Sequence, residues 1–141
     1  MKLPFKVDLS DKVAVVTGGG GVLMSAFGEA LVKSGAKVAF LDINEEAVKK
    51  VVEGLGDNAM AVKCNCLDKA DIARAKAEVN ARFGKVNFLI NGAGGNNPKA
   101  TCDNETMTPD LTGVKDFFAL DESGLKFVFD LNITSAFLVT Q

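Results

Sequence analysis

Four consecutive glycines, Gly18 to Gly21, constrain the fold more than any other feature of this sequence. They follow a short apolar run, Val13–Val16, and precede a segment that begins at Val22 and carries apolar residues at helical spacing. A buried strand, a glycine turn and a helix in this order are typical of a doubly wound α/β sheet. Glycines let the backbone approach a pyrophosphate, and the free N–H groups at the helix N-terminus bind the anion. The segment therefore predicts a phosphate-binding turn.

The spacing of this loop leaves an alternative open, because it is not a clean G-x-G-x-x-G. Leu23 and Met24 stand where a third glycine is expected. A Walker-type loop is excluded, since no Gly-Lys-Ser/Thr follows the glycines. A glycine-rich turn without any ligand therefore remains a competing interpretation.

Asp42 favours a ligand over an empty turn. It ends the predicted strand Lys37–Leu41, 21 residues beyond Gly21, where an acid that binds ribose is expected. A carboxylate there accepts hydrogen bonds from the 2′-hydroxyl of adenosine and repels a 2′-phosphate. Because no arginine follows to offset that charge, the sequence predicts NAD rather than NADP. Capping of the helix that starts near Asn44 is an alternative role for Asp42, and the two roles are compatible.

The rest of the chain alternates strands and helices. Further strands are predicted at Lys37–Leu41, Ala59–Val62 and Val86–Ile90, and the helices are expected to begin at Val22, near Asn44 and at Asp68 or Asp71. Right-handed crossovers then give the strand order 3-2-1-4. The expected fold is an α/β Rossmann doubly wound parallel sheet, truncated to its first four strands. A second glycine-rich stretch, Asn91–Gly95, follows the fourth strand and lies beside the first glycine turn at the switch point of the sheet.

The last third of the chain has a different composition. Residues 96–124 are polar and contain Pro98 and Pro109, so we expect a polar insertion that acts as a lid or a mobile segment. A last helix is expected to begin near Leu125 and to bury Leu125, Val128, Leu131, Ser135 and Val139. It has no stop signal before Gln141, so we expect residues 1–141 to be the N-terminal part of a single NAD-binding domain.

Composition narrows the possible partners and location. The chain has 141 residues and a net charge of −2, with acidic and basic residues interspersed. No nucleic-acid or membrane surface is therefore expected, and no apolar run reaches the roughly 18 residues of a membrane helix. The start, MKLPFKVDLS, lacks a signal-peptide core, which favours the cytoplasm. Cys64, Cys66 and Cys102, with no histidine, make a poor metal site, and we expect reduced structural thiols.

These motifs together resemble the short-chain dehydrogenase/reductase family, matched over its N-terminal half. The matching residues are Thr17 with its glycine loop, Asp42, the Asn91-Gly92-Ala93-Gly94 motif and Asn132. Within the family, NGAGGNNPKAT and FFALDESGLKFVFDLN are similar to the branch that contains D-mannonate oxidoreductase (fructuronate reductase) and related sugar dehydrogenases.

The resemblance implies a set of cofactor-binding residues and one catalytic residue. Asp42 would hold the adenosine ribose, Asn65 would stand where an adenine-binding aspartate is common, and Asn132 would support a water-linked proton relay. The implied cofactor-binding set is Thr17, Gly18, Gly20, Gly21, Val22, Asp42, Asn65, Cys66, Asn91, Gly92, Ala93 and Gly94. As alternatives, Asn91 only ties strand ends together and Asn132 is only a satisfied polar residue on a helix.

The departures from the family limit the expected activity. Val22 and Met24 replace common glycines, and the chain contains no tyrosine. The family relies on a serine and a Tyr-x-x-x-Lys pair, and a positioned acid or base contributes about 10²–10⁴ in rate. We therefore expect these residues to bind NAD without turning over an alcohol.

The function predicted for the parent protein is NAD(H)-dependent oxidation or reduction of a sugar acid or polyol. Lys99 could meet a substrate carboxylate, although a solvated lysine is the simpler interpretation. A non-catalytic nucleotide-binding module and an extended Rossmann protein such as a sugar-nucleotide epimerase remain alternatives. The apolar strand Val86–Ile90 would be an exposed sheet edge, so we also expect self-association into a homo-oligomer.

Overall fold

The computed structural model describes residues 7–107 and 109–141. Residues 1–6 lie outside the described residues. They belong to the N-terminal stretch MKLPFKVDLS, from which the sequence predicts the lack of a signal-peptide core. The strands are β1 (Val13–Thr17), β2 (Lys37–Asp42), β3 (Ala59–Lys63) and β4 (Phe88–Ile90). The α-helices are α1 (Val22–Lys33), α2 (Glu45–Val52), α3 (Lys69–Phe83), α4 (Glu122–Phe129) and α5 (Ser135–Thr140).

The four strands form one parallel sheet in the order β3-β2-β1-β4. This confirms the predicted order 3-2-1-4 and the Rossmann class of the fold. β1 lies in the middle of the sheet and pairs with β2 from Val13 opposite Lys37 to Thr17 opposite Leu41. The loops that follow β1 and β4 therefore leave neighbouring strands at the same edge of the sheet.

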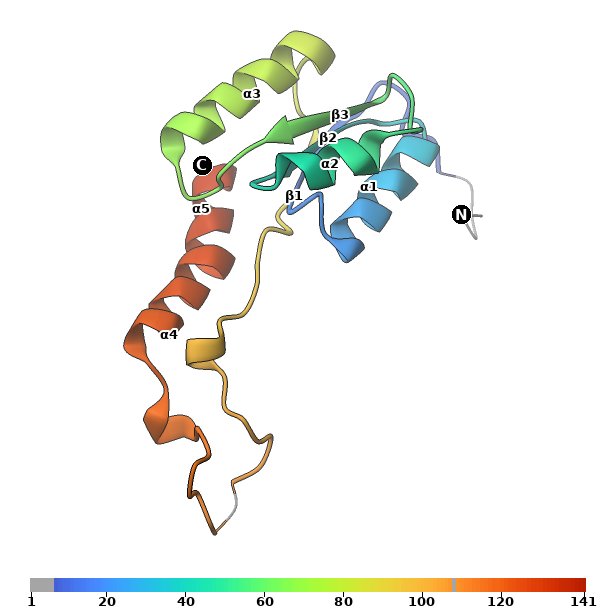
Figure 1. Ribbon diagram of the computed structural model, residues 1–141. Coiled ribbons are helices and arrows are strands. Elements are labelled where there is room, and N and C mark those ends of the chain that lie inside the picture. The colour runs from blue at the N-terminus through green and yellow to red at the C-terminus, as the bar shows by residue number, and fades with distance from the viewer. Residues whose placement is uncertain (1–6, 108) are drawn as a thin grey trace.

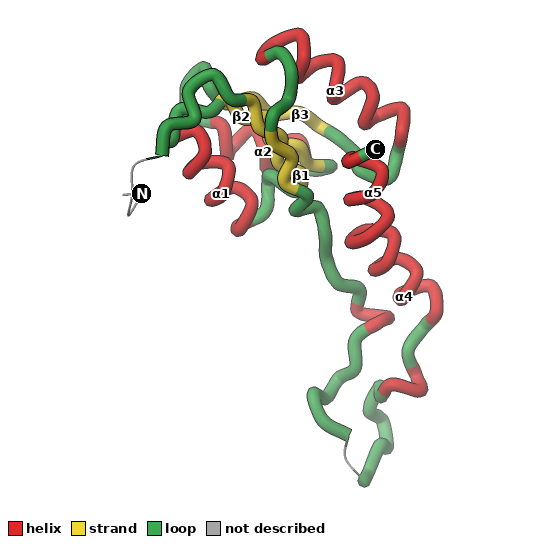
Figure 2. The backbone as a smooth tube through the Cα atoms, turned by 180° about the vertical axis from the view of Figure 1, so that it is seen from behind, coloured by secondary structure: helices red, strands yellow, loops and turns green. Residues whose placement is uncertain are grey.

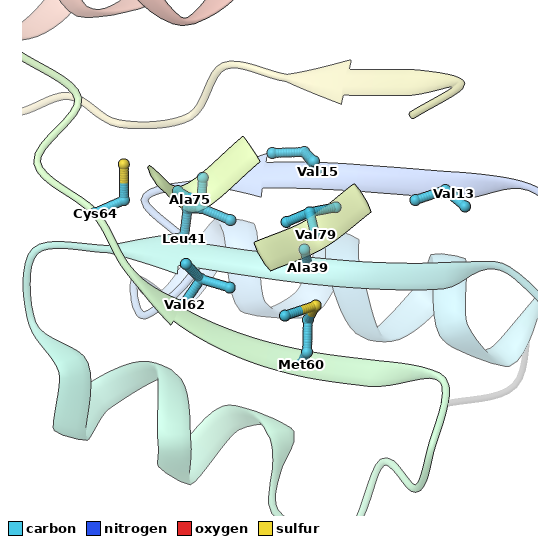
Figure 3. Packing of buried hydrophobic residues seen from close by; sticks show 9 residues of the cluster. All are labelled: Val13, Val15, Ala39, Leu41, Met60, Val62, Cys64, Ala75 and Val79. Atoms are coloured by element: carbon cyan, nitrogen blue, oxygen red, sulfur yellow. The ribbon is translucent and has the colours of Figure 1, made fainter. Parts of the chain in front are cut away.

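Helices cover the two faces of the sheet in separate layers (Figure 1). On one face α1 and α2 cover a cluster that includes Val16, Phe40 and Val48. On the other face Ala75 and Val79 of α3 pack on alternate residues of the strands, and Cys64 lies at one end of this cluster (Figure 3). All five residues of β1 are buried, as expected for a strand that is covered on both sides.

Two local predictions need correction in this region. β4 begins at Phe88 rather than Val86, because the Asn87 side chain accepts from the Val13 N–H at 2.9 Å and so replaces a ladder hydrogen bond. On α1, Val22, Leu23 and Phe27 are exposed although they follow the helical apolar spacing. The buried residue of this helix is instead Gly28, which packs so close to β2 that an added Cβ would overlap the Phe40 ring.

The C-terminal helix begins earlier than predicted. It starts at Glu122, because Asp121 caps it by accepting from the Ser123 N–H at 2.7 Å. Leu125 is 52% exposed, so its predicted burial was wrong, whereas Ser135 is buried and Val128, Leu131 and Val139 are half-buried. A π-helical turn, Asp130–Thr134, separates α4 from α5.

Residues 96–107 and 109–121, together with α4, extend away from the sheet as an arm (Figures 1 and 2). Within the arm, two short 3₁₀ turns cover Pro98–Ala100 and Phe117–Ala119. The Asp121 N–H donates to the Lys99 carbonyl at 3.0 Å, which ties the start of the polar segment to the start of α4. The end of the predicted polar insertion therefore lies next to its beginning.

Candidate functional site

The first glycine loop, Gly18–Gly21, makes a tight turn between β1 and α1. Gly18 has a φ of +67°, and a Cβ added there would lie 2.6 Å from the Gly92 carbonyl oxygen. The Gly19 N–H donates to the Leu41 carbonyl and the Gly21 N–H to the Gly18 carbonyl, both at 2.9 Å. Only glycine fits the backbone at Gly18 without strain, so the turn depends on this residue for its shape.

The N-terminus of α1 is left open for an anion. Gly21 is the N-cap of α1. Among the described residues, no side chain caps this helix, and its first turn contains no acidic residue. The first-turn N–H groups of an α-helix have no acceptor within the helix and carry the positive end of its dipole. The geometry suits a phosphate group, as the glycine pattern predicts.

Asp42 lies at the end of β2 and faces the first glycine loop. Its Oδ2 accepts from the Gly20 N–H at 3.0 Å, and its Oδ1 accepts from the Asn44 N–H at 2.9 Å. Asn44, not Asp42, caps α2, because its side chain accepts from the Ala47 N–H. Each carboxylate oxygen keeps further acceptor capacity, so a pair of hydroxyl groups could still bind Asp42.

A cavity of about 190 Å³ opens beside Asp42, at the carboxyl ends of the strands. It brings together predicted site residues from four separate segments, namely Gly18, Asp42, Asn65, Cys66, Ala93 and Gly94. Sequence reasoning missed the apolar lining formed by Ile43, Cys64, Leu67 and Leu131. Ile43 and Cys64 directly follow β2 and β3, two positions beyond the predicted strand ends at Leu41 and Val62, so position near a strand end was the available signal. Leu131 comes from the C-terminal helix and had no such signal.

The chain between β3 and α3 forms one wall of this cavity and is held by α3. The Asn65 N–H donates to Asp71 Oδ2 at 2.7 Å, and Arg74 bonds both Asp71 and the Lys63 carbonyl. The hydrogen bond from Asn65 and the Arg74 guanidinium hold the pKa of Asp71 below its ordinary value. The Asn65 Oδ1 accepts from the Leu67 N–H at 3.0 Å, so this predicted adenine acceptor also shapes the wall itself.

Thr17 connects the first glycine loop to a second glycine loop, Asn91–Gly95. The Thr17 hydroxyl oxygen accepts from the Gly92 N–H at 3.0 Å and from the Ala93 N–H at 3.1 Å. Thr17 is buried at 1% exposure, so this link is shielded from water. These contacts fix the second loop, so Thr17, a member of the cofactor-binding set that the family resemblance implies, contributes to the site through that loop.

Asn132 also holds the second glycine loop, through Gly95. Its Nδ2 donates to the Gly95 carbonyl at 2.7 Å and to the Val128 carbonyl at 2.8 Å, and its Oδ1 accepts from the Gly95 N–H at 3.2 Å. Asn132 lies in the π-helical turn, a feature that is frequent at functional sites. The Asn91 Nδ2 donates to Thr140 Oγ1 at 2.9 Å, which ties the end of β4 to α5.

The residues present fit a dinucleotide. The α1 N-terminus and the Gly18 turn suit a pyrophosphate, Asp42 suits a ribose diol, and Ile43 and Leu67 offer apolar contact for a flat base. The described residues include no group of three or more His, Cys, Asp or Glu side chains placed to hold a metal ion. Nor is any helix in the described ranges long and apolar enough to cross a membrane.

Comparison with known proteins gives one consistent result. The family model described as short chain dehydrogenase matches residues 12–141. An uncharacterised oxidoreductase of Haemophilus influenzae is 42% identical over all of this chain and 51% of its own length. One of Bacillus subtilis is 44% identical over 99% of this chain and 51% of its own length. The chain therefore spans about half the length of these relatives.

Solved structures agree with the sequence relatives. A Haemophilus influenzae protein provisionally assigned as a D-mannonate oxidoreductase, crystallised with NAD, is 42% identical and superposes with a TM-score of 0.90. That match covers 96% of this chain and 50% of the other. A 3-ketoacyl-(acyl-carrier-protein) reductase of Brucella melitensis, in complex with NADH, is 25% identical with a TM-score of 0.75 and covers 94% of this chain and 49% of its own.

Proposed function

Because this chain belongs to the short-chain dehydrogenase family, we propose that it forms the NAD(H)-binding part of an oxidoreductase acting on a sugar acid or polyol. When bound, the nicotinamide would accept or donate the hydride. The chain's own residues bind and orient the cofactor: the first glycine loop and the α1 N-terminus take the pyrophosphate, and Asp42 takes the adenosine ribose. Asn65 and Cys66 border the base, and Asn91, Gly92, Ala93 and Gly94 run along the cofactor.

The position of Asp42 carries this proposal. Its carboxylate lies in the cavity beside the glycine turn and is fixed by the Gly20 and Asn44 amides. A fixed negative charge at this place binds hydroxyl groups and repels a phosphate, so it selects NAD over NADP. The NAD in the similar Haemophilus structure supports the same choice.

Calorimetric titration of the purified protein with NAD and NADP tests the proposal. We expect NAD to bind and NADP to bind far more weakly. Asp42→Asn should weaken NAD binding by roughly 10- to 100-fold, since hydrogen bonds to a charged group contribute about 1.5–3 kcal/mol. Asp57→Asn, at an exposed position before β3, serves as the matched control and should leave the affinity unchanged. Equal affinity for NAD in wild type and Asp42→Asn would overturn the assignment.

The substrate class rests on the relatives rather than on this cavity. The branch motifs in the sequence and the D-mannonate assignment of the similar structure support a sugar acid. NADH oxidation with fructuronate-like ketones, and NAD reduction with mannonate-like acids, test it on the protein at its native length. We propose Asn132 as the member of the catalytic set in this chain, where it would support a water-linked proton relay while its side chain is held by the Gly95 N–H and carbonyl.

A non-catalytic nucleotide-binding module is the second candidate, since the cavity residues described above bind a nucleotide without supplying an acid or base of their own. It predicts NAD binding without turnover of any alcohol or ketone. We further propose a cytoplasmic location and a homo-oligomer. The exposed edge strand β4, where Phe88 is 42% exposed, supports self-association. A monomer by light scattering at high concentration would contradict it.

A further inference from the structure

A second cavity, here called the arm cavity, opens where the arm leaves the second glycine loop. It has a volume of about 450 Å³, and small-molecule sites usually have about 300–1,000 Å³. Its polar side chains come from the outgoing and the returning stretch of the arm, namely Asn96, Asn97, Thr101, Asp103 and Lys115. None of them has a part in binding the dinucleotide.

The arm cavity begins next to the loop that Asn132 holds. Its first lining residue, Asn96, directly follows Gly95, whose N–H and carbonyl are both bonded by the Asn132 side chain. Consecutive Cα atoms are about 3.8 Å apart, so the Cα atom of Asn97 lies within about 8 Å of that of Gly95. A ligand with one end in the arm cavity can therefore reach this loop.

Hydrogen bonds and close packing fix the wall of the arm cavity. The Thr101 hydroxyl donates to the Asn97 carbonyl, and the Asn97 Oδ1 accepts from the Lys99 N–H, both at 2.9 Å. Lys99 also packs so closely on α4 that a Cβ added at Gly124 would lie 2.7 Å from the Lys99 Cβ. This wall is therefore shaped by the chain itself.

Lys115 supplies a positive charge to the arm cavity. Its side chain is 34% exposed, and its Nζ donates to the Pro98 carbonyl and lies 4.0 Å from Asp103 Oδ1. The Lys115 N–H donates to Asp103 Oδ2 at 2.8 Å, and the Asp103 N–H donates to the Lys115 carbonyl at 2.9 Å. An ammonium group has three N–H donors, so Lys115 keeps at least one for a ligand.

The sequence suggests Lys99 for such a contact, but Lys99 does not line the arm cavity. Its charge lies near Asp121 instead: hydrogen bonds from Ser123 lower the pKa of Asp121, and the Lys99 charge adds to this shift. Within the described part of the chain, the Nδ2 groups of Asn96 and Asn97 donate to no acceptor. The arm cavity thus combines one ammonium with open amide donors, and a carboxylate only accepts hydrogen bonds.

We propose that the arm cavity binds the carboxylate end of the substrate and that Lys115 selects a sugar acid over a neutral polyol. This proposal rests on the proposed function, which places the reacting end near the loop held by Asn132. The carboxylate accepts from Lys115 Nζ and from the amide donors, and hydrogen bonds between charged groups are stronger than neutral ones. A polyol makes the neutral hydrogen bonds only. The Asp103 charge acts in the opposite direction, because it repels a carboxylate.

Titration and kinetics with an acid and its neutral counterpart test the subsite. Protein at its native length, saturated with NAD, is titrated with mannonate and with mannitol by calorimetry, and KM and kcat are measured for both. Lys115→Met should raise the Kd and KM for mannonate by roughly 10- to 100-fold, with little change in kcat or in either constant for mannitol. Lys115→Arg should restore most of the affinity. Asp103→Asn should strengthen mannonate binding by about 2- to 5-fold. Lys126→Met, at an exposed position on α4, is the matched control and should leave both ligands unaffected.

The outcomes separate the subsite from the cofactor site. Equal losses for mannonate and mannitol in Lys115→Met would reveal a merely structural role and overturn the proposal. A larger loss in Lys99→Met than in Lys115→Met would overturn it in favour of Lys99. Failure of the NAD-saturated wild type to bind mannonate would overturn the subsite, while NAD titration still reports on the proposed function. If NAD itself does not bind, mannonate titration of the protein without NAD still tests Lys115.

Discussion

The two glycine loops lie side by side, but different interactions hold them. The first loop is held by the Gly21–Gly18 hydrogen bond within it, by the bond from the Gly19 N–H to the Leu41 carbonyl of β2, and by Asp42 at the end of β2. The second loop, Asn91–Gly95, is held by side chains from other segments: Thr17 bonds the Gly92 and Ala93 amides, and Asn132 bonds Gly95. The first loop is thus built by the local strand-turn-helix unit, whereas the second depends on distant residues. Substitutions in the two loops should therefore behave differently.

Gly18→Ala should have the largest effect on stability. Alanine at φ +67° costs about 1–2 kcal/mol, and its Cβ would meet the backbone oxygen of Gly92 at 2.6 Å, which adds about 1–3 kcal/mol. Urea unfolding measures the change. Gly54→Ala is the control, because Gly54 has a φ of +84° with nothing within 4 Å of an added Cβ. If the two variants lose the same stability, the close approach of the two loops is wrong.

Thr17→Val should come next, with a loss of about 2 kcal/mol in the free energy of unfolding. Valine keeps the shape of threonine but leaves the Gly92 and Ala93 N–H groups without their acceptor, and unsatisfied buried donors are costly. Amide hydrogen exchange should show faster exchange at Gly92 and Ala93 than at Gly19. Thr17→Ser retains the hydroxyl and should protect both amides. Unchanged exchange in Thr17→Val would mean that the second loop is held by its own backbone.

Gly92→Ala should be milder than Gly18→Ala, although an added Cβ would overlap the Met24 sulfur. A methionine side chain can move, whereas a backbone carbonyl cannot. We therefore expect Gly92→Ala to lower the free energy of unfolding by about 1–2 kcal/mol. The added Cβ would also lie 2.9 Å from the Thr17 carbonyl oxygen, and this contact accounts for the part of the destabilisation that movement of Met24 cannot relieve. Met24→Ala should recover part of the loss in a double-mutant cycle measured by urea unfolding. Additive effects would show that Met24 does not fill this space.

The sequence predicts the first loop far better than the second. Strand ends, glycines and Asp42 lie within one local unit, so periodicity and spacing give β1, α1 and β2 nearly to the residue. The contact of Thr17 with Gly92 joins residues 75 positions apart, and no local pattern encodes it. The same holds for Leu131 in the cavity and for the π-helical turn at Asn132, which a regular apolar spacing cannot indicate. The predicted site residues therefore cover only part of the cavity lining: Leu131 on the helix side was missed, and so were Ile43, Cys64 and Leu67 near the strand ends.

Asn132→Ala should have the smallest effect on stability, because Asn132 is exposed and its hydrogen bonds compete with water. We expect a loss of about 1 kcal/mol or less. The effect on the loop should be larger than this value suggests, since Asn132 contacts both the N–H and the carbonyl of Gly95. Gly94 and Gly95 should exchange their amide hydrogens faster, while the first loop stays protected. Asn96→Ala is the matched control, because the Asn96 side chain bonds only the next amide. Equal exchange in both variants would leave Asn132 without a role in positioning the second loop, and any loss of turnover in Asn132→Ala would then require direct contact with the reacting groups.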